Sequence, residues 1–144
     1  MNRGLLALVE SRLVGEDLAL ELERAGWEVE RLPGDVLGIE SFRHYARSRA
    51  PKALVSINHS PELAWLATWE GLTRYVSWTV DPLPVERLRV LDGTRMDDVR
   101  IFLHRSSQVP LFRSLGFPCV QWLPLAAPRR RFEQVPETRE RELP

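Results

Sequence analysis

Polar side chains follow two short apolar segments of this 144-residue chain. Asn58, His59 and Ser60 come directly after the run at residues 53–57, and Asp81 comes after a second run of this kind. Histidine titrates near neutral pH and aspartate accepts hydrogen bonds from hydroxyl groups, so either residue type can act as a general base. We therefore take His59 and Asp81 as candidate catalytic residues, and Asn58 and Ser60 as candidate substrate-binding residues.

Further polar residues follow other apolar runs in the same way. Glu10 and Ser11 come after the first run of the chain, and His104 and Arg105 come after the fifth. His104 and Arg105 can meet a phosphate, because free backbone N–H groups at the start of the following helical segment favour anions. These four residues complete the candidate substrate-binding set. A purely structural role in loops is the alternative for each of these four residues and for His59, and Asp81 with Pro82 can equally be a turn former.

The elements that must position these residues alternate along the chain. Strand-like apolar runs occupy residues 5–9, 27–32, 53–57, 75–80, 99–103 and 119–123. Apolar side chains recur at helical spacing between most of these runs. Residues 83–98 are ambiguous, and we expect a short helix there and a turn at Asp92 and Gly93. Each parallel connection requires a crossover segment, so the alternation predicts an α/β fold. We expect a Rossmann-like open parallel sheet of about six strands with helices on both faces.

Such a sheet gives the candidate residues a common location. The carboxyl ends of parallel strands lie at one edge of the sheet. Ligands bind in the crevice beyond that edge, near the point where the strand order reverses. The candidate residues all follow strand-like runs, so we expect them to lie along this single rim.

Several known sites are excluded by sequence. The turn after the first strand reads Glu-Ser-Arg-Leu-Val-Gly, which lacks the G-x-G-x-x-G spacing of a dinucleotide site. The chain contains no P-loop and no G-x-S-x-G nucleophile elbow. The histidines and Cys119 have no close metal-ligand spacing, and a single cysteine excludes an internal disulfide. We therefore expect no cofactor and no metal in this chain.

Composition limits the partners and the location. Lys+Arg and Asp+Glu both number 20, which gives no electrostatic argument for binding nucleic acid. The first apolar run is too short for a signal peptide or a membrane span. We therefore expect a cytoplasmic protein with no membrane span and no nucleic-acid partner. Residues 1–127 form the predicted domain, and the Arg-, Glu- and Pro-rich residues 128–144 form a tail or linker.

Tryptophan is frequent, with five residues in the chain. Trp65, Trp69, Trp78 and Trp122 can form an aromatic platform for a sugar ring, or they can belong to the core. Tryptophans within apolar runs are more often core residues. We therefore expect Trp78 and Trp122 to be buried.

Three segments resemble a known family: "PKALVSINHS", "GLTRYVSWTVDPLP" and "VRIFLHRSSQVPLFRSLGFPCVQWLPLAAPRRRF". Together they are similar to the N-terminal half of a GT-B fold glycosyltransferase of the CgeB-like group, whose N-terminal domain has been catalogued as a domain of unknown function. The matching positions are Trp78, Asp81, Pro82, Leu115, Gly116, Leu123, Pro124, Ala126, Ala127 and Phe132.

The resemblance implies an acceptor-side domain. In the family, a separate C-terminal domain binds the nucleotide sugar that serves as donor, and residues 128–144 would be the linker towards it. The implied partners are that domain and a sugar or protein acceptor, and the chain alone would be inactive because transfer needs donor and acceptor in one cleft. Whether the chain is part of an enzyme stays open, because a non-catalytic Rossmann-like binding or assembly module is the alternative.

Overall fold

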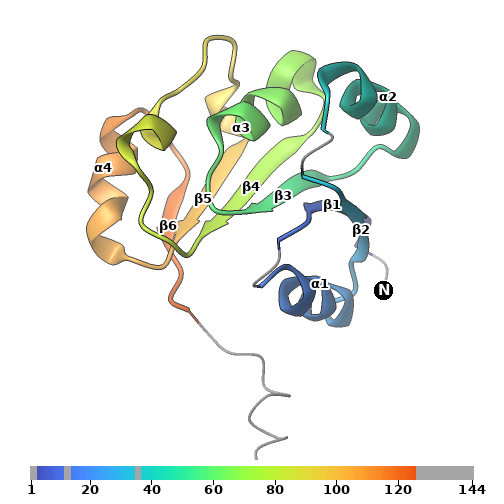
Figure 1. Ribbon diagram of the computed structural model, residues 1–144, viewed down its shortest axis with the longest axis horizontal. Coiled ribbons are helices and arrows are strands. Elements are labelled where there is room, and N and C mark those ends of the chain that lie inside the picture. Colours follow the sequence, from blue (N-terminus) through green and yellow to red (C-terminus); the bar gives the residue numbers. More distant parts are fainter. Residues whose placement is uncertain (1–2, 12–13, 35–36, 126–144) are drawn as a thin grey trace, which may run out of the picture.

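The structure, a computed structural model, describes residues 3–11, 14–34 and 37–125. It contains one six-stranded sheet in the order β2-β1-β3-β4-β5-β6, with every neighbouring pair parallel (Figure 1). The strands are β1 (Leu5–Val9), β2 (Glu28–Leu32), β3 (Ala53–Ile57), β4 (Arg74–Thr79), β5 (Val99–Leu103) and β6 (Val120–Trp122). The predicted α/β fold with a Rossmann-like open sheet is confirmed.

Helices connect most strands. They are α1 (Gly15–Arg24), α2 (Ile39–Arg49), α3 (Pro61–Thr68) and α4 (Val109–Ser114), with 3-10 turns η1 (Trp69–Gly71), η2 (Val85–Leu88), η3 (Met96–Asp98) and η4 (Ser106–Gln108). The connection from β4 to β5 contains η2 and η3 in place of an α-helix. This is the segment whose sequence lacks helical periodicity. Among the described residues, no helix has the length and apolarity needed to cross a membrane.

The strand order decides which face of the sheet each helix covers. The chain steps one way along the sheet from β1 to β2, and every later connection steps the other way. Parallel crossovers are right-handed, so a change of direction moves the helix to the opposite face. Accordingly α2, α3 and α4 pack on one face, and among the described helices α1 alone packs on the other (Figure 1).

Burial along the strands reflects this unequal cover. All five residues of β1 are buried, as expected for a strand covered on both faces. In β4 and β5 buried residues alternate with partly exposed ones. Tyr75 and Ile101 face the helices α2 to α4, whereas Val76 and Phe102 face the side that α1 only partly covers. One face of β4 and β5 therefore lacks a packed layer among the described residues.

The prediction that Trp122 is a core residue is wrong. Its side chain is 58% exposed, because β6 is a three-residue strand at the edge of the sheet. Its indole Nε1 donates a hydrogen bond to the carbonyl oxygen of His104 at 3.0 Å. Trp78 is partly buried on the less covered face, where its Nε1 lies 3.5 Å from the carbonyl oxygen of Leu123. Both tryptophans therefore anchor β6 and the residue that follows it, and neither fills the core.

Candidate functional site

Asn58 joins the carboxyl end of β3 to that of β4. It has a left-handed backbone with φ of +63°, a conformation that asparagine adopts more readily than most residues. Its Oδ1 accepts hydrogen bonds from the backbone N–H groups of Val80 at 2.9 Å and Asp81 at 3.1 Å. Its Nδ2 donates to Oδ2 of Asp81 at 2.8 Å. The carboxamide is thus used to fix Asp81 in place.

The two residues after Asn58 are bound to β4 as well. The backbone N–H of His59 donates to Oγ1 of Thr79 at 3.1 Å, and the N–H of Ser60 donates to the Tyr75 hydroxyl at 2.9 Å. Ser60 also caps α3, since its Oγ accepts the N–H of Leu63 at 3.3 Å. The polar residues that end β3 therefore have structural partners, which explains much of this sequence pattern.

The imidazole of His59 lies in the core. The residue is 2% exposed, and its ring centroid lies 5.3 to 5.8 Å from the rings of Tyr75, Phe112 and Phe117. Neither ring nitrogen has a hydrogen-bond partner among the described residues. Burial lowers the pKa of His59 to about 4, so the ring is neutral at pH 7.

A buried ring cannot act on a molecule at the rim. A general base must come within hydrogen-bond reach of the proton that it removes. Aromatic side chains enclose His59 instead, so its position gives no support to the predicted catalytic role. Nothing in the sequence distinguishes this histidine from an exposed one, because it lies in the same loop as Asn58 and Ser60.

Asp81, in contrast, is exposed at the carboxyl end of β4. Among the described residues, Asn58 is the only hydrogen-bond partner of its carboxylate. The carboxylate therefore has a fixed orientation and retains capacity to accept a hydrogen bond from a bound hydroxyl group. This combination of orientation and access makes Asp81 the best placed of the predicted catalytic residues.

His104 lies on the adjacent strand end. Thr79 of β4 pairs with Leu103 of β5 at the carboxyl ends of the two strands, and His104 follows Leu103 in sequence. Its Nδ1 lies 3.4 Å from the carbonyl oxygen of Thr79, and its Nε2 lies 3.4 Å from Nε of Arg105. In this geometry Nδ1 can donate to the Thr79 carbonyl oxygen while Nε2 accepts from Arg105. His104 is half-buried and Arg105 is exposed.

The phosphate site expected beside Arg105 has weak geometric support. α4 has only six residues and is preceded by η4. Neither element has a side-chain cap. So short a helix has little aligned dipole with which to favour an anion.

Glu10 and Ser11 line a separate polar hollow of about 510 Å³ at the ends of β1 and β2. Glu16 at the start of α1 and Arg31 at the end of β2 complete its charged lining. Acidic residues in the first turn of α1 satisfy the positive end of the helix dipole, which disfavours a phosphate there. Carboxylates, a hydroxyl and a guanidinium together suit a ligand with several hydroxyl groups.

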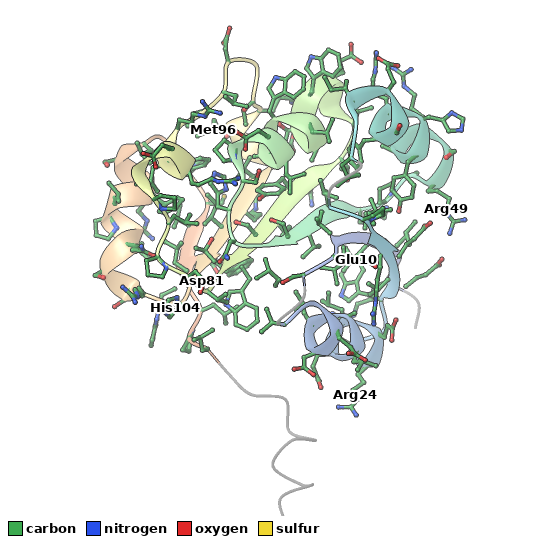
Figure 2. The ribbon with its side chains drawn as sticks, in the orientation of Figure 1. Glu10, Arg24, Arg49, Asp81, Met96 and His104 are labelled. Carbon is green, nitrogen blue, oxygen red and sulfur yellow. The ribbon has the colours of Figure 1, made fainter. Side chains whose placement is uncertain are left out.

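The predicted site residues thus form two groups on one rim. The strand order reverses between β1 and β3, and this is where open α/β sheets bind ligands. Glu10 and Ser11 lie on one side of that point, and Asn58 and Asp81 lie on the other. In Figure 2 Asp81 and His104 appear at the ends of β4 and β5, well away from Glu10. Parallel pairing places the carboxyl ends of all six strands at one edge of the sheet, and the candidate residues follow those strand ends in sequence.

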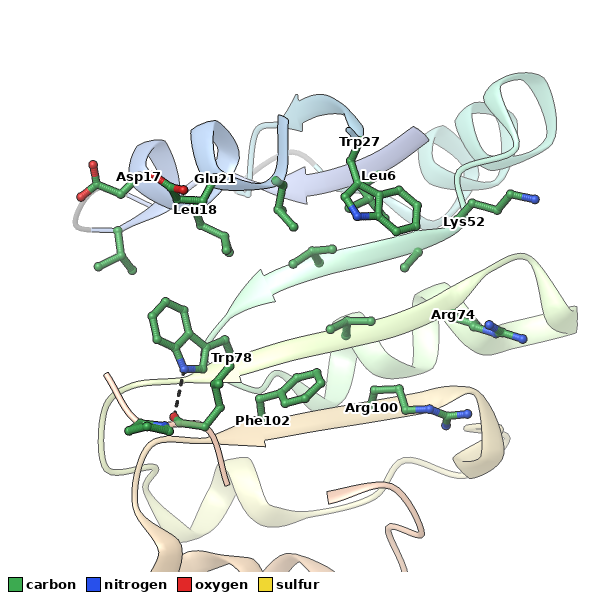
Figure 3. Close-up of a pocket in the computed structure, with 17 residues that line it drawn as sticks. Leu6, Asp17, Leu18, Glu21, Trp27, Lys52, Arg74, Trp78, Arg100 and Phe102 are labelled. Carbon is green, nitrogen blue, oxygen red and sulfur yellow. Dashed lines mark hydrogen bonds between the residues drawn. The ribbon is translucent and has the colours of Figure 1, made fainter. Parts of the chain in front are cut away.

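A larger hollow lies elsewhere and was not predicted. A groove of about 810 Å³ runs along the less covered face of the sheet, between α1 and the residues that follow β6 (Figure 3). Its floor is apolar and includes Val55, Val76 and Phe102. The alternation of apolar and polar residues in β4 and β5 is the signal that could have revealed it, because fully covered parallel strands are continuously apolar.

Two other tryptophans lie away from the rim that carries Asp81. Trp65 and Trp69 stack with ring centroids 5.0 Å apart and an interplanar angle of 19°. The guanidinium of Arg43 lies 4.8 Å from the ring centroid of Trp69. The pair belongs to α3 and η1, which lead back to the amino end of β4. A sugar platform formed by Trp65 and Trp69 would therefore lie at the edge opposite Asp81.

No family model, no curated protein and no solved structure matches this chain. In the part of the chain that the structure describes, no three His, Cys, Asp or Glu side chains are grouped to hold a metal ion. The function must therefore be inferred from the geometry of the rim and the groove.

Proposed function

We propose that this chain is the acceptor-side Rossmann-like domain of a glycosyltransferase, which moves a sugar from a nucleotide sugar to an acceptor. The observation that carries the proposal is the exposed carboxylate of Asp81, held by Asn58 beside the reversal point of a parallel sheet. The resemblance of the segments around Asp81 to the CgeB-like group supports the same inference.

Asp81 would receive the proton of the acceptor hydroxyl. In an inverting transfer the acceptor oxygen forms a bond to the anomeric carbon, and the bond from that carbon to the diphosphate breaks. The electron pair of the broken bond leaves with the nucleoside diphosphate, and the hydroxyl proton moves to Asp81. Asn58 would act as a positioning residue, because it fixes one oxygen of the carboxylate.

The polar hollow would bind other hydroxyl groups of the acceptor. Glu10 and Glu16 accept hydrogen bonds and Arg31 donates them, which matches the mixed donors and acceptors of a sugar. The donor nucleotide would be held mainly by a separate C-terminal domain. In keeping with this, the turn into α1 lacks a glycine-rich phosphate loop and the first turn of α1 is acidic.

The test compares two aspartate variants in the complete natural gene product. Release of nucleoside diphosphate is measured from a panel of nucleotide sugars with monosaccharide and disaccharide acceptors. Asp81→Asn should lower kcat by about 100- to 10,000-fold, the usual contribution of a general base. Asp92→Asn is the matched control, because Asp92 is an exposed aspartate in the turn before η3. Normal turnover by Asp81→Asn would remove this residue from the mechanism.

A second candidate function, a non-catalytic binding or assembly module, is favoured by the apolar groove. Soluble domains rarely leave a large contiguous apolar surface without a partner. If the complete gene product releases no nucleoside diphosphate from any nucleotide sugar, the transferase proposal is wrong and the module takes its place.

A further inference from the structure

The groove on the less covered face has a cationic end and an apolar middle (Figure 3). Lys52, Arg74 and Arg100 line the end at the amino edge of the sheet, because they lie at or next to the first residues of β3, β4 and β5. Further along the same face the side chains are apolar, among them Val76 and Phe102. The groove therefore has the polarity of an amphipathic ligand.

The strand register brings the three cationic side chains together. Lys52 directly precedes Ala53, which pairs with Arg74. Arg100 pairs with Val76, which lies on the same face of β4 as Arg74 because alternate residues of a strand share a face. Neighbouring strands lie about 4.8 Å apart, and lysine and arginine side chains are long. One anionic group at the amino edge can therefore contact all three side chains.

The positive charge at this end is not balanced by carboxylates. In the part of the chain that the structure describes, none of the three cationic residues forms a salt bridge. Nη1 of Arg100 donates to two backbone carbonyl oxygens, at 2.6 and 3.2 Å, which holds the guanidinium in place without neutralising it. The acidic residues of the lining, Asp17 and Glu21, belong to α1, and Figure 3 places Asp17 towards the carboxyl edge. An anionic ligand is therefore oriented with its charge at the amino edge.

The middle of the groove suits a hydrocarbon chain. Val55, Val76 and Phe102 lie on its floor, and Leu18 and Leu22 of α1 line one wall. Its volume of about 810 Å³ lies in the range of small-molecule sites, which are mostly apolar with a few polar groups. Burial of a hydrocarbon chain against these side chains would stabilise the complex in proportion to the apolar area removed from water.

The length of the groove limits the length of the chain. Arg74 and Trp78 are four residues apart on β4, which corresponds to about 13 Å. Carbon–carbon bonds are about 1.5 Å long, so about ten of them in a zigzag span this distance. The indole Nε1 of Trp78 lies 3.5 Å from the carbonyl oxygen of Leu123, and this contact holds the ring at the carboxyl end.

We propose that this groove binds a single-chain lipid with a phosphate monoester head group. The head group contacts Lys52, Arg74 and Arg100, and the chain runs over the apolar floor towards Trp78. A phosphate monoester carries about 1.5 to 2 negative charges at pH 7 and three acceptor oxygens, which matches three cations better than a carboxylate does. The proposal does not depend on the glycosyltransferase function, because the head group lies at the edge of the sheet opposite Asp81.

NMR titration of the whole chain with decyl phosphate, below its micelle concentration, tests the proposal. Methyl signals of Val55 and Val76 and the indole signal of Trp78 should shift and saturate. Methyl signals of Leu66 and Leu111, on helices of the opposite face, should not shift. Each methylene removed, in octyl and hexyl phosphate, should raise the Kd about two- to fourfold. The absence of a saturable shift in the groove, or a Kd independent of chain length, would overturn the proposal.

Other probes separate the possible occupants. Inorganic phosphate, decanoate and decyltrimethylammonium should each bind the groove more weakly than decyl phosphate. Equal binding by inorganic phosphate would show that the apolar floor has no role, equal binding by decanoate would refute the phosphate head group, and equal binding by the ammonium compound would refute the charge match. Groove signals that change with protein concentration, without any added lipid, would show that a second copy of the chain is the occupant.

A matched pair of double variants tests the cationic end. Lys52→Gln with Arg74→Gln should raise the Kd for decyl phosphate about tenfold, because two charged contacts are lost. Arg47→Gln with Arg113→Gln removes the same charge from α2 and α4 on the opposite face and should leave the Kd unchanged. All four side chains are exposed, so these changes leave the core intact. Equal Kd values for the two double variants would overturn the proposed head-group site.

Discussion

Asn58 and Asp81 are 23 positions apart in sequence and exchange two hydrogen bonds in the fold. The Asn58 carboxamide donates to Oδ2 of Asp81 at 2.8 Å and accepts the backbone N–H of the same residue at 3.1 Å. This reciprocal pair ties the end of β3 to the end of β4. It also gives an exposed carboxylate one fixed orientation, which is what a site residue on a loop needs.

Removal of the Asn58 side chain should therefore destabilise the fold. Asn58→Ala loses the hydrogen bonds to Val80 and Asp81 and places alanine at a φ of +63°. We expect a loss of about 2 to 3 kcal/mol in the free energy of unfolding, measured in urea. Asn58→Gly loses the same bonds without the backbone strain, so it should be about 1 kcal/mol more stable than the alanine variant. Equal stability of the two variants would show that the left-handed backbone carries no cost here.

The Tyr75 hydroxyl is a second anchor of the same turn. It accepts the N–H of Ser60 at 2.9 Å and lies 2.7 Å from Oγ of Ser56, in a residue with no exposed surface. Tyr75→Phe leaves a partly buried N–H without its acceptor, which should lower the free energy of unfolding by about 1 to 3 kcal/mol. Tyr45→Phe is the matched control, because among the described residues the Tyr45 hydroxyl bonds only the side chain of Glu30, at 3.2 Å, in a partly buried position. A larger loss in the control than in Tyr75→Phe would contradict this account.

Much of the fold could be predicted because its signals are local. The continuous apolar run of β1 and the alternating residues of β2 are typical of a central and an edge strand, and these are the positions that the two strands occupy. Ser60 caps α3 and Pro61 lies in its first turn, a pattern that neighbouring residues alone make recognisable. Such features depend on residues close in sequence, so periodicity and capping rules detect them.

The candidate site could be predicted only in part. Parallel pairing places the strand ends on one edge, which follows from the fold class alone. The direction in which each side chain points does not follow from the fold class. The left-handed turn at Asn58 sends His59 into the core among rings contributed by β4, α4 and the segment after α4, and that packing depends on distant residues. The exposure of Trp122 likewise depends on β6 being the edge strand.

His59 should make stability depend on pH. Its pKa is about 4 in the fold, because burial disfavours the charged ring, and 6.5 is the ordinary value expected in the unfolded chain. The unfolded chain therefore binds more protons between these values, so stability is full above pH 6.5, falls as the pH drops towards 4 and levels off below it. The loss attributable to this group is about 3 kcal/mol.

Matched histidine variants isolate this contribution. His59→Phe, suited to an aromatic environment, should flatten the fall in the free energy of unfolding between pH 6.5 and 4. His44→Gln removes an exposed histidine of α2 and should leave the fall unchanged. The Glu62 carboxylate raises the pKa of His59, and Arg87 lowers it. The pKa of Glu62 is itself lowered to about 2, so Glu62 stays ionised throughout this window. An identical pH profile in His59→Phe and the unaltered protein would refute the buried neutral ring.

Ala50 offers a stabilising change at the end of α2. It is the C-cap, with a φ of +48°, and its N–H donates to the carbonyl oxygen of Ala46 at 2.9 Å. A left-handed conformation costs an L-residue about 1 to 2 kcal/mol, whereas glycine adopts it freely. Ala50→Gly should therefore raise the free energy of unfolding by about 1 kcal/mol, because part of the gain is lost to the greater freedom of glycine in the unfolded chain. Ala25→Gly is the control: Ala25 ends α1 with a φ of −75°, so the same substitution there should destabilise, and a gain at both positions would contradict the conformational explanation.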